Sequence, residues 1–385
     1  MTVDRSPPSL PEAVDPLQRA AGYSAWGLYS LIVLEILFMV SPFAAYYYAA
    51  YGIPLNALAD APATAWLTWQ VLPHFAYNSS VLVNGLILIA WPLILVGLLL
   101  FLWGFVQIYR ARFGGRGPVT GGLYRHIRHP QYLALAVVGL GTTLYWSRFL
   151  VIAAYVLMLA IYGLLARLEE ALCLRRFGAP YAAYLERTGR FLPRAWETKL
   201  GRMWPQLALT PVQRLGLGFV LLASLLTAAL GGAWLLRQHA LASIQVETGF
   251  GHTAVYLAPM AAGDRRQVLA HAVQALDKPA RLLYVVPAHW TVPELGLAAS
   301  GPDLENGRAY ATTHGNRGGF DRERIRVLVT EPELAGPAST GRAQLARAVR
   351  VTPHAVLTLD LTTDALTMDD PPGPGRWQGV PVPLF

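Results

Sequence analysis

The stretch RHIRHPQY, residues 125–132, places basic side chains directly before an apolar run. Pro130 fits the first turn of a helix, because the N–H that it lacks would be unpaired there anyway. Arg128 and His129 would therefore lie just before a helix N-terminus, where free N–H groups and the positive end of the helix dipole attract anions. The alternative is that these side chains are membrane-flanking cations that contact lipid headgroups, and it applies above all to Arg125 and His126.

A second candidate cluster lies in ARLEEALCLRRFG, residues 166–178, where Glu169 and Glu170 follow a long apolar run. Ionisable side chains at membrane depth are costly, so they are functional candidates by default. Adjacent helical residues point about 100° apart, and the two carboxylates therefore cannot both contact the same ligand atom. We expect one carboxylate to hold a ligand cation or ribose hydroxyls while the other pairs with an arginine. A salt-bridged helix end, formed with the neighbouring arginines, is the alternative.

Membrane helices must position these residues. The 385-residue chain is 54% hydrophobic and only 14% charged, whereas soluble proteins carry about 25% charged residues. Most of its nearly charge-free segments approach the roughly 17–25 residues that cross a bilayer. These segments are 24–50, 79–109, 131–146, 149–166 and 213–236. We predict an all-α polytopic membrane domain with about five membrane helices, followed by a small extracytoplasmic α+β domain.

The charge distribution predicts the orientation. Residues 1–236 carry 17 Lys and Arg against nine Asp and Glu, a net charge of +8, whereas residues 237–385 carry 14 of each kind. Basic loops stay in the cytosol, so the segments after the second and fourth spans are expected there. The loop 51–78 has no Lys or Arg and is expected outside. The use of 29 Arg against two Lys favours a bacterial source, and hence a bacterial inner membrane with a periplasmic C-terminal domain.

This topology predicts four parts of the chain. They are a cytosolic arm at 1–22, a membrane domain with a cytosolic cofactor site at 23–212, a last membrane helix at 213–236 and an extracytoplasmic domain at 237–385.

The short segments 131–146 and 149–166 predict a tight helical hairpin, with Trp146 and Arg148 anchoring its tip at the far membrane interface. The hairpin would return the chain to the face where it began, which brings the candidate anion site and the acid pair together. A ligand with a carboxylate, an ammonium, a ribose and a further positive charge would suit such a cleft. S-adenosylmethionine carries all four groups.

The C-terminal 149 residues have a composition typical of a soluble domain. RLLYVVP (281–287) and RIRVLVT (324–330) predict strands, and residues 354–370 predict a β-hairpin. Apolar residues recur at helical spacing in 264–277 and 341–350. This domain offers a surface for an extracytoplasmic protein partner, for oligomerisation or for covering the outer hairpin, and its sequence does not choose among these.

Several classes of site are excluded. The single cysteine, Cys173, cannot form an internal disulfide or a multi-cysteine metal site. The chain has no H-E-x-x-H motif and no glycine-rich turn after a strand, so we expect no metal and no soluble-type nucleotide fold. The zero net charge of residues 237–385 argues against nucleic acid as a partner.

The order of the motifs adds a resemblance. GLYRHIRHPQYL, then EE after about 40 residues, then FGAPYAAYLERTGRFLP, resembles the isoprenylcysteine carboxyl methyltransferases and phospholipid methyltransferases over about 115–194. The resemblance implies an integral membrane enzyme that binds S-adenosylmethionine in a cytosolic pocket, closed by the segment after the acid pair. It implies cofactor contacts from the His-Pro-x-Tyr element and the acid pair, which correspond to His129, Pro130, Tyr132, Glu169 and Glu170.

The resemblance suggests further contacts. The phospholipid branch has a Gly-x-Gly on the intervening helix, which Gly139 and Gly141 match, although small residues also serve helix packing. Tyr181 and Tyr184 could cover the cofactor, or they could simply pack against their neighbours.

The predicted reaction is methyl transfer to a lipophilic acceptor, by in-line attack of a carboxylate, amine or thiol of a lipid-like or isoprenoid-like molecule. Proximity and orientation would be the protein's main contribution. Arg128 would hold a carboxylate acceptor, and Glu170 would act as a general base for an amine. Two alternatives stay open: an NADPH-dependent membrane sterol-type reductase, whose R-H-P-x-Y element is similar, and a non-catalytic membrane sensor that acts through its outer domain.

Overall fold

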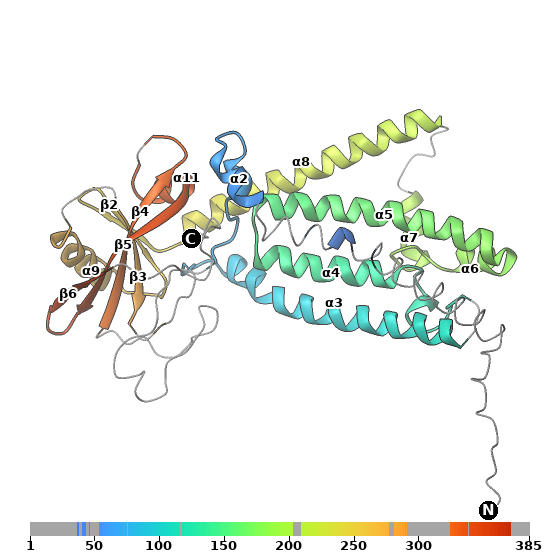
Figure 1. Ribbon diagram of the computed structural model, residues 1–385, viewed down its shortest axis with the longest axis horizontal. Coiled ribbons are helices and arrows are strands. Elements are labelled where there is room, and N and C mark those ends of the chain that lie inside the picture. Colours follow the sequence, from blue (N-terminus) through green and yellow to red (C-terminus); the bar gives the residue numbers. More distant parts are fainter. Residues whose placement is uncertain are drawn as a thin grey trace, which may run out of the picture.

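The computed structural model describes residues 37, 41–43, 46, 54–74, 76–114, 118–202, 209–276, 281–288, 290, 324–337 and 339–370. The predicted first span, 24–50, lies almost entirely outside these residues. Helices occupy one end of the molecule and a β-sheet occupies the other (Figure 1).

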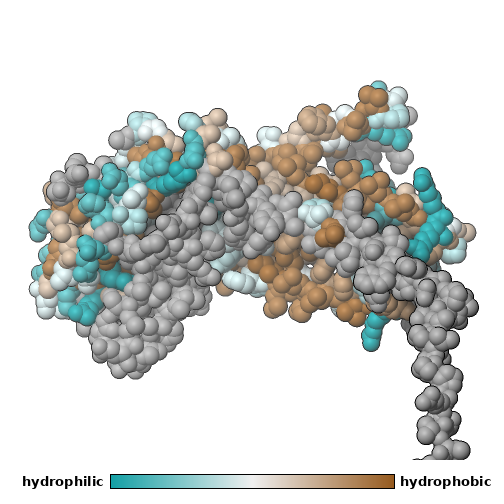
Figure 2. Space-filling view, in the orientation of Figure 1, coloured by the Kyte–Doolittle hydropathy of each residue, from teal (hydrophilic) through white to brown (hydrophobic). Residues whose placement is uncertain are grey.

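Among the described residues, three helices are long and apolar enough to cross a membrane: α3 (Val81–Phe113), α5 (Phe149–Phe177) and α8 (Pro211–Ser243). Large apolar side chains on their surfaces face outward, and brown side chains make up much of the coloured surface of the helices in Figure 2. Exposed apolar surface on this scale marks contact with lipid. A fourth helix, α4 (Pro130–Tyr145), has 16 residues, which is short for a full crossing.

Helices α3 and α4 approach closely through small residues. A Cβ atom on Gly97 would lie 2.7 Å from the Val138 side chain and 2.9 Å from the carbonyl oxygen of Ala134. Further along, a Cβ on Gly141 would lie 2.6 Å from the carbonyl oxygen of Ala90. Small residues let membrane helices pack backbone against backbone, so this contact fixes α4 against α3.

This contact predicts a clear difference between two glycines of α3. Gly97→Ala should lower the melting temperature of the detergent-solubilised protein, because backbone atoms of α4 must move away from the new methyl group. Gly85→Ala is the matched control, since a Cβ there meets nothing within 4 Å, and alanine favours a helix over glycine by about 1 kcal/mol. Equal melting temperatures for the two variants would contradict this packing.

The predicted helical hairpin of α4 and α5 is confirmed, but its tip differs from the prediction. Trp146 and Arg148 are 8% and 2% exposed, so neither anchors the tip in the lipid interface. Trp146 stacks on His74 with ring centroids 4.3 Å apart, and Arg148 Nη1 donates a hydrogen bond to the carbonyl oxygen of Thr68. The segment before α3 covers the tip, and a sequence pattern does not reveal such a distant partner.

Shorter elements complete the helical part. They are α2 (Pro54–Asp60), the 3-10 turns η1 (Ala65–Thr68) and η2 (Gly122–Arg125), α6 (Ala179–Arg187) and α7 (Arg194–Arg202). Gly178 joins α5 to α6 with φ at +60°, a conformation that favours glycine.

The described part of the C-terminal domain contains a six-stranded sheet with strands in sequential order, in which β2 and β3 run parallel and the other neighbours run antiparallel. The strands predicted at 281–287 and 324–330 and the hairpin within 354–370 are confirmed. Two strands, β1 and β2, were not predicted. The elements are β1 (Val246–Gly249), β2 (His252–Tyr256), α9 (Ala262–Gln274), β3 (Leu282–Pro287), β4 (Arg324–Leu334), α11 (Arg342–Arg347), β5 (Ala348–Asp360) and β6 (Leu366–Asp369).

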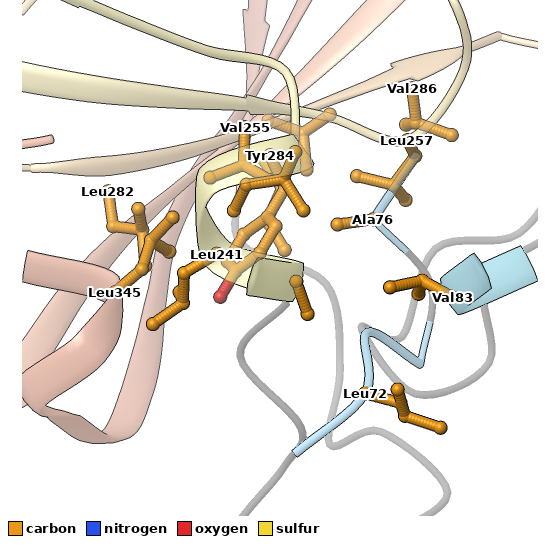
Figure 3. Packing of buried hydrophobic residues seen from close by; sticks show 14 residues of the cluster. Leu72, Ala76, Val83, Leu241, Val255, Leu257, Leu282, Tyr284, Val286 and Leu345 are labelled. Atoms are coloured by element: carbon orange, nitrogen blue, oxygen red, sulfur yellow. The ribbon is translucent and has the colours of Figure 1, made fainter. Parts of the chain in front are cut away.

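Both faces of the sheet are buried. One face packs on α9, through Val268, Leu269 and Ala272. The other face packs on the end of α8 and on the segment that leads into α3, where Leu241, Tyr284 and Val83 lie in one cluster (Figure 3). The sheet is therefore fixed to the end of the membrane helices at which α3 begins. The candidate site lies toward the other end of α3, beside Gly104, whose Cβ position is 3.0 Å from Gln131 of α4; Gly104 is about 35 Å along the helix from Val81.

Candidate functional site

The start of α4 is paired with the loop that follows α6. The N–H groups of Arg128 and His129 donate hydrogen bonds to the carbonyl oxygens of Gly189 and Arg190, at 2.9 and 3.1 Å, and the N–H of Gly189 donates to His126 at 3.3 Å. Pro130 is the first residue of α4, which confirms the predicted helix start. This pairing brings together residues 61 to 63 positions apart, beside the C-terminal part of α5 where the acid pair lies.

Glu170 is buried within a cage of positive groups. Its carboxylate accepts hydrogen bonds from Arg128 Nε at 2.7 Å and from Arg190 Nη2 at 2.5 Å, and His129 Nε2 lies 3.3 Å away. The side chain is only 10% exposed. The predicted pairing of one acid with an arginine is therefore confirmed, and the carboxylate has two guanidinium partners. A carboxylate engaged on three sides is poorly placed to collect a proton from a substrate.

The guanidinium of Arg128 forms its hydrogen bonds inside the protein. Besides Glu170, its guanidinium donates to the carbonyl oxygens of Leu185 and Thr188, at the C-terminal end of α6. The last carbonyl groups of a helix lack partners within the helix, so a buried guanidinium satisfies them well. The side chain is 7% exposed. This geometry gives Arg128 a positioning role that joins α4, α5 and α6, and the predicted contact with an acceptor stays a prediction.

Glu169 has a different environment from its neighbour. Its side chain is 48% exposed, the Tyr132 hydroxyl donates to Oε1, and His129 Nδ1 lies 3.5 Å from Oε2. The Tyr132 ring stacks between His129 and Tyr162, with centroids 5.6 and 4.7 Å away. Glu169 is thus held in place on one side and open on the other, as expected for a ligand-binding carboxylate.

His129 lies between the two acids. Burial opposes its protonation, but the hydrogen bonds and charges of Glu169 and Glu170 outweigh burial and raise the pKa of the imidazole. Both ring nitrogens face a carboxylate, and only the protonated ring donates from both. When protonated, His129 links the buried acid to the exposed one.

Arg190 and Glu197 also belong to the site, although the sequence did not point to either. The Glu197 carboxylate accepts hydrogen bonds from the N–H groups of Arg190, Phe191 and Leu192, at 2.7, 2.9 and 3.2 Å. Glu197 thereby shapes the loop that presents Arg190 to Glu170. In the sequence, Arg190 is marked only as a basic residue beside a glycine in a short link between helices. Its partner, Glu170, lies 20 residues earlier in the chain.

Removal of the Glu197 carboxylate should destabilise this loop. Burial opposes its ionisation, but the three backbone N–H groups prevail and lower the pKa of Glu197. The stabilisation is complete above the unfolded pKa of about 4.3 and is lost as the pH falls through the lower folded value. Glu197→Gln should therefore lower the melting temperature at pH 7, by an amount that shrinks at pH 4 and below. A difference that does not depend on pH would contradict this assignment.

Tyr181 and Tyr184 are buried beside the cluster. The Tyr184 hydroxyl donates to the carbonyl oxygen of Tyr124 at 2.7 Å, and Thr188 Oγ1 donates to the carbonyl oxygen of Tyr184. Tyr181 packs against Phe177 and Tyr184. These contacts favour the packing alternative for Tyr184 and leave Tyr181 as a candidate at the edge of the site.

Gly139 and Gly141 lie away from the acid pair. A Cβ on Gly139 would meet Tyr155 and Met158 of α5 at 2.9 and 3.0 Å, and Gly141 packs on α3. Gly139 also accepts a hydrogen bond from the Tyr46 hydroxyl at 2.9 Å. Both glycines lie more than two turns into α4 from its start, about 13 Å or more along the axis. These contacts are those of helix packing and do not join either glycine to Glu169, so a cofactor contact from Gly139 or Gly141 stays a prediction.

Comparison with known families agrees with this arrangement. Residues 80–179 match the family model described as phospholipid methyltransferase. The match spans α3, α4 and α5 and includes His129, Glu169 and Glu170, whereas Arg190 follows it. No curated protein and no solved structure matched the chain. This integral membrane protein is therefore similar, over residues 80–179, to the phospholipid methyltransferase family.

Proposed function

We propose that this protein transfers a methyl group from S-adenosylmethionine to a lipophilic acceptor. The observation that carries the proposal is the half-exposed carboxylate of Glu169, held by Tyr132 and His129 at the end of a membrane helix within the matched domain. The acceptor that we propose is a carboxylate, amine or thiol of a lipid-like or isoprenoid-like molecule, which reaches the site from the bilayer.

The residues present fit the amino-acid end of S-adenosylmethionine. Glu169 offers a carboxylate for the ammonium group or the ribose hydroxyls, and Tyr132 and His129 fix its orientation. The side chain of Arg190 is 31% exposed, so its guanidinium can also contact a ligand carboxylate. The exposed carboxylate of Glu169 and the exposed part of Arg190 together suit a zwitterion.

S-adenosylmethionine, when bound, supplies a methyl group that is already activated by the sulfonium, so the chain's task is to orient the reactants. Glu169 binds and orients the cofactor end. Arg128 and Arg190 bind Glu170. These ion pairs hold the start of α4 and the end of α6 against α5. Glu170 is engaged by Arg128, Arg190 and His129, which does not favour its predicted role as a general base for an amine acceptor.

Calorimetric titration of the detergent-purified protein with S-adenosylmethionine, and separately with NADPH, tests this proposal. We expect S-adenosylmethionine to bind the native chain and to bind Glu169→Gln at least about tenfold more weakly, a loss typical of a charged hydrogen bond. Glu186→Gln is the control, because this exposed acid lies on α6. Binding of NADPH alone would support the reductase alternative, and binding of neither ligand would contradict an enzymatic site here.

A further inference from the structure

Helix α7 is amphipathic and has no buried residue. Trp196 and Leu200, one turn apart, are 66% and 47% exposed and share one face, and Leu192 just before the helix is 40% exposed. Arg194 and Arg202 lie on the opposite face with Thr198, and Lys199 lies at the border of the apolar face. Such a helix exposes apolar and cationic groups together.

The position of α7 in the chain indicates what contacts its exposed surface. Helix α5 ends at Phe177 and α8 begins at Pro211, so α7 belongs to the connection between two membrane helices. Figure 1 shows it at the end of the helices where α6 lies. A short amphipathic helix at this level meets lipid headgroups, and three cations against one acid make α7 complementary to an anionic layer.

We propose that α7 is a binding site for anionic phospholipids of the bilayer surface, with Trp196 and Leu200 inserted and the cations at headgroup level. The site is connected to the acid pair, because Glu197 of α7 holds the backbone of residues 190–192 and Arg190 pairs with Glu170. Lipid binding at α7 therefore positions Arg190. This inference stands apart from the methyl-transfer proposal, since it rests on α7 and its contacts alone.

A depth measurement tests the inference on the full chain. Cys173 is replaced by alanine, and a single cysteine is then placed at position 200 (Leu200→Cys) or 198 (Thr198→Cys) and labelled with a fluorophore. Each protein is reconstituted in nanodiscs of phosphatidylcholine, with and without phosphatidylglycerol, and quenched by a nitroxide on the acyl chain. We expect quenching at position 200 to exceed that at 198 by about twofold, and to increase with phosphatidylglycerol.

A charge variant separates the two parts of the interaction. With Arg194, Lys199 and Arg202 replaced by glutamine, the increase caused by phosphatidylglycerol should disappear while position 200 stays the more strongly quenched one. Equal quenching at 198 and 200 would overturn the insertion of this face. A response to phosphatidylglycerol that survives in the glutamine variant would overturn the anionic-lipid site. Neither result depends on whether S-adenosylmethionine binds.

Discussion

Replacement of Arg128 by alanine is expected to destabilise the protein by about 3 kcal/mol, the lower end of the range for an acid that loses a buried partner. The loss leaves Glu170 with one guanidinium instead of two and leaves the carbonyl groups of Leu185 and Thr188 without this donor. Arg190 keeps the effect from being larger, because it still pairs with Glu170. The melting temperature of the full chain in detergent measures the change.

Two further variants make this test specific. Arg128→Lys keeps the charge but lacks the planar fork that reaches the carboxylate and two carbonyl groups at once, so we expect an intermediate melting temperature. Arg125→Ala removes an exposed arginine three residues earlier and should melt like the native protein. If Arg128→Ala also melts like the native protein, Arg128 is not the buried link between α4, α5 and α6.

Replacement of the two adjacent acids is expected to separate binding from stability. Glu170→Gln should lower the melting temperature strongly, because two arginines and His129 lose their shared counter-charge in a buried site. Glu169→Gln should leave the melting temperature almost unchanged, since its side chain is 48% exposed, and should weaken S-adenosylmethionine binding. Melting curves and titrations of both variants, made on the same preparations, give the comparison.

The opposite result for the two variants would contradict these assignments. If Glu169→Gln unfolds the protein while Glu170→Gln only weakens binding, the exposed acid is structural and the buried acid is the ligand group. The structure predicts the opposite order, because adjacent positions on α5 point one carboxylate into the protein and the other toward the open side.

The sequence predicted the local features of the site well. The start of α4 at Pro130 follows from proline chemistry, and the different surroundings of Glu169 and Glu170 follow from helical geometry. Strands β3 and β4 and the hairpin of β5 and β6 follow from runs of alternating or continuous apolar residues, whereas β1 and β2 were not predicted. Each of these expectations depends on neighbours in the chain.

Contacts between distant segments could not be predicted in the same way. Arg190 reaches Glu170 only because residues 126–129 pair with the loop around Gly189. Arg148, expected at the lipid interface, is buried by the segment that includes Thr68, 80 residues earlier in the chain. No periodicity or short motif encodes such pairings. The partner of a charged side chain can therefore be identified only from the fold.

The most direct test of the central claim is transfer of a labelled methyl group. Membranes that contain the protein are incubated with methyl-labelled S-adenosylmethionine, and the label is measured in the lipid extract. We predict label in the extract with the native chain and with Glu186→Gln, and almost none with Glu169→Gln. Equal labelling with Glu169→Gln, or no label above that of membranes without the protein, would contradict the account.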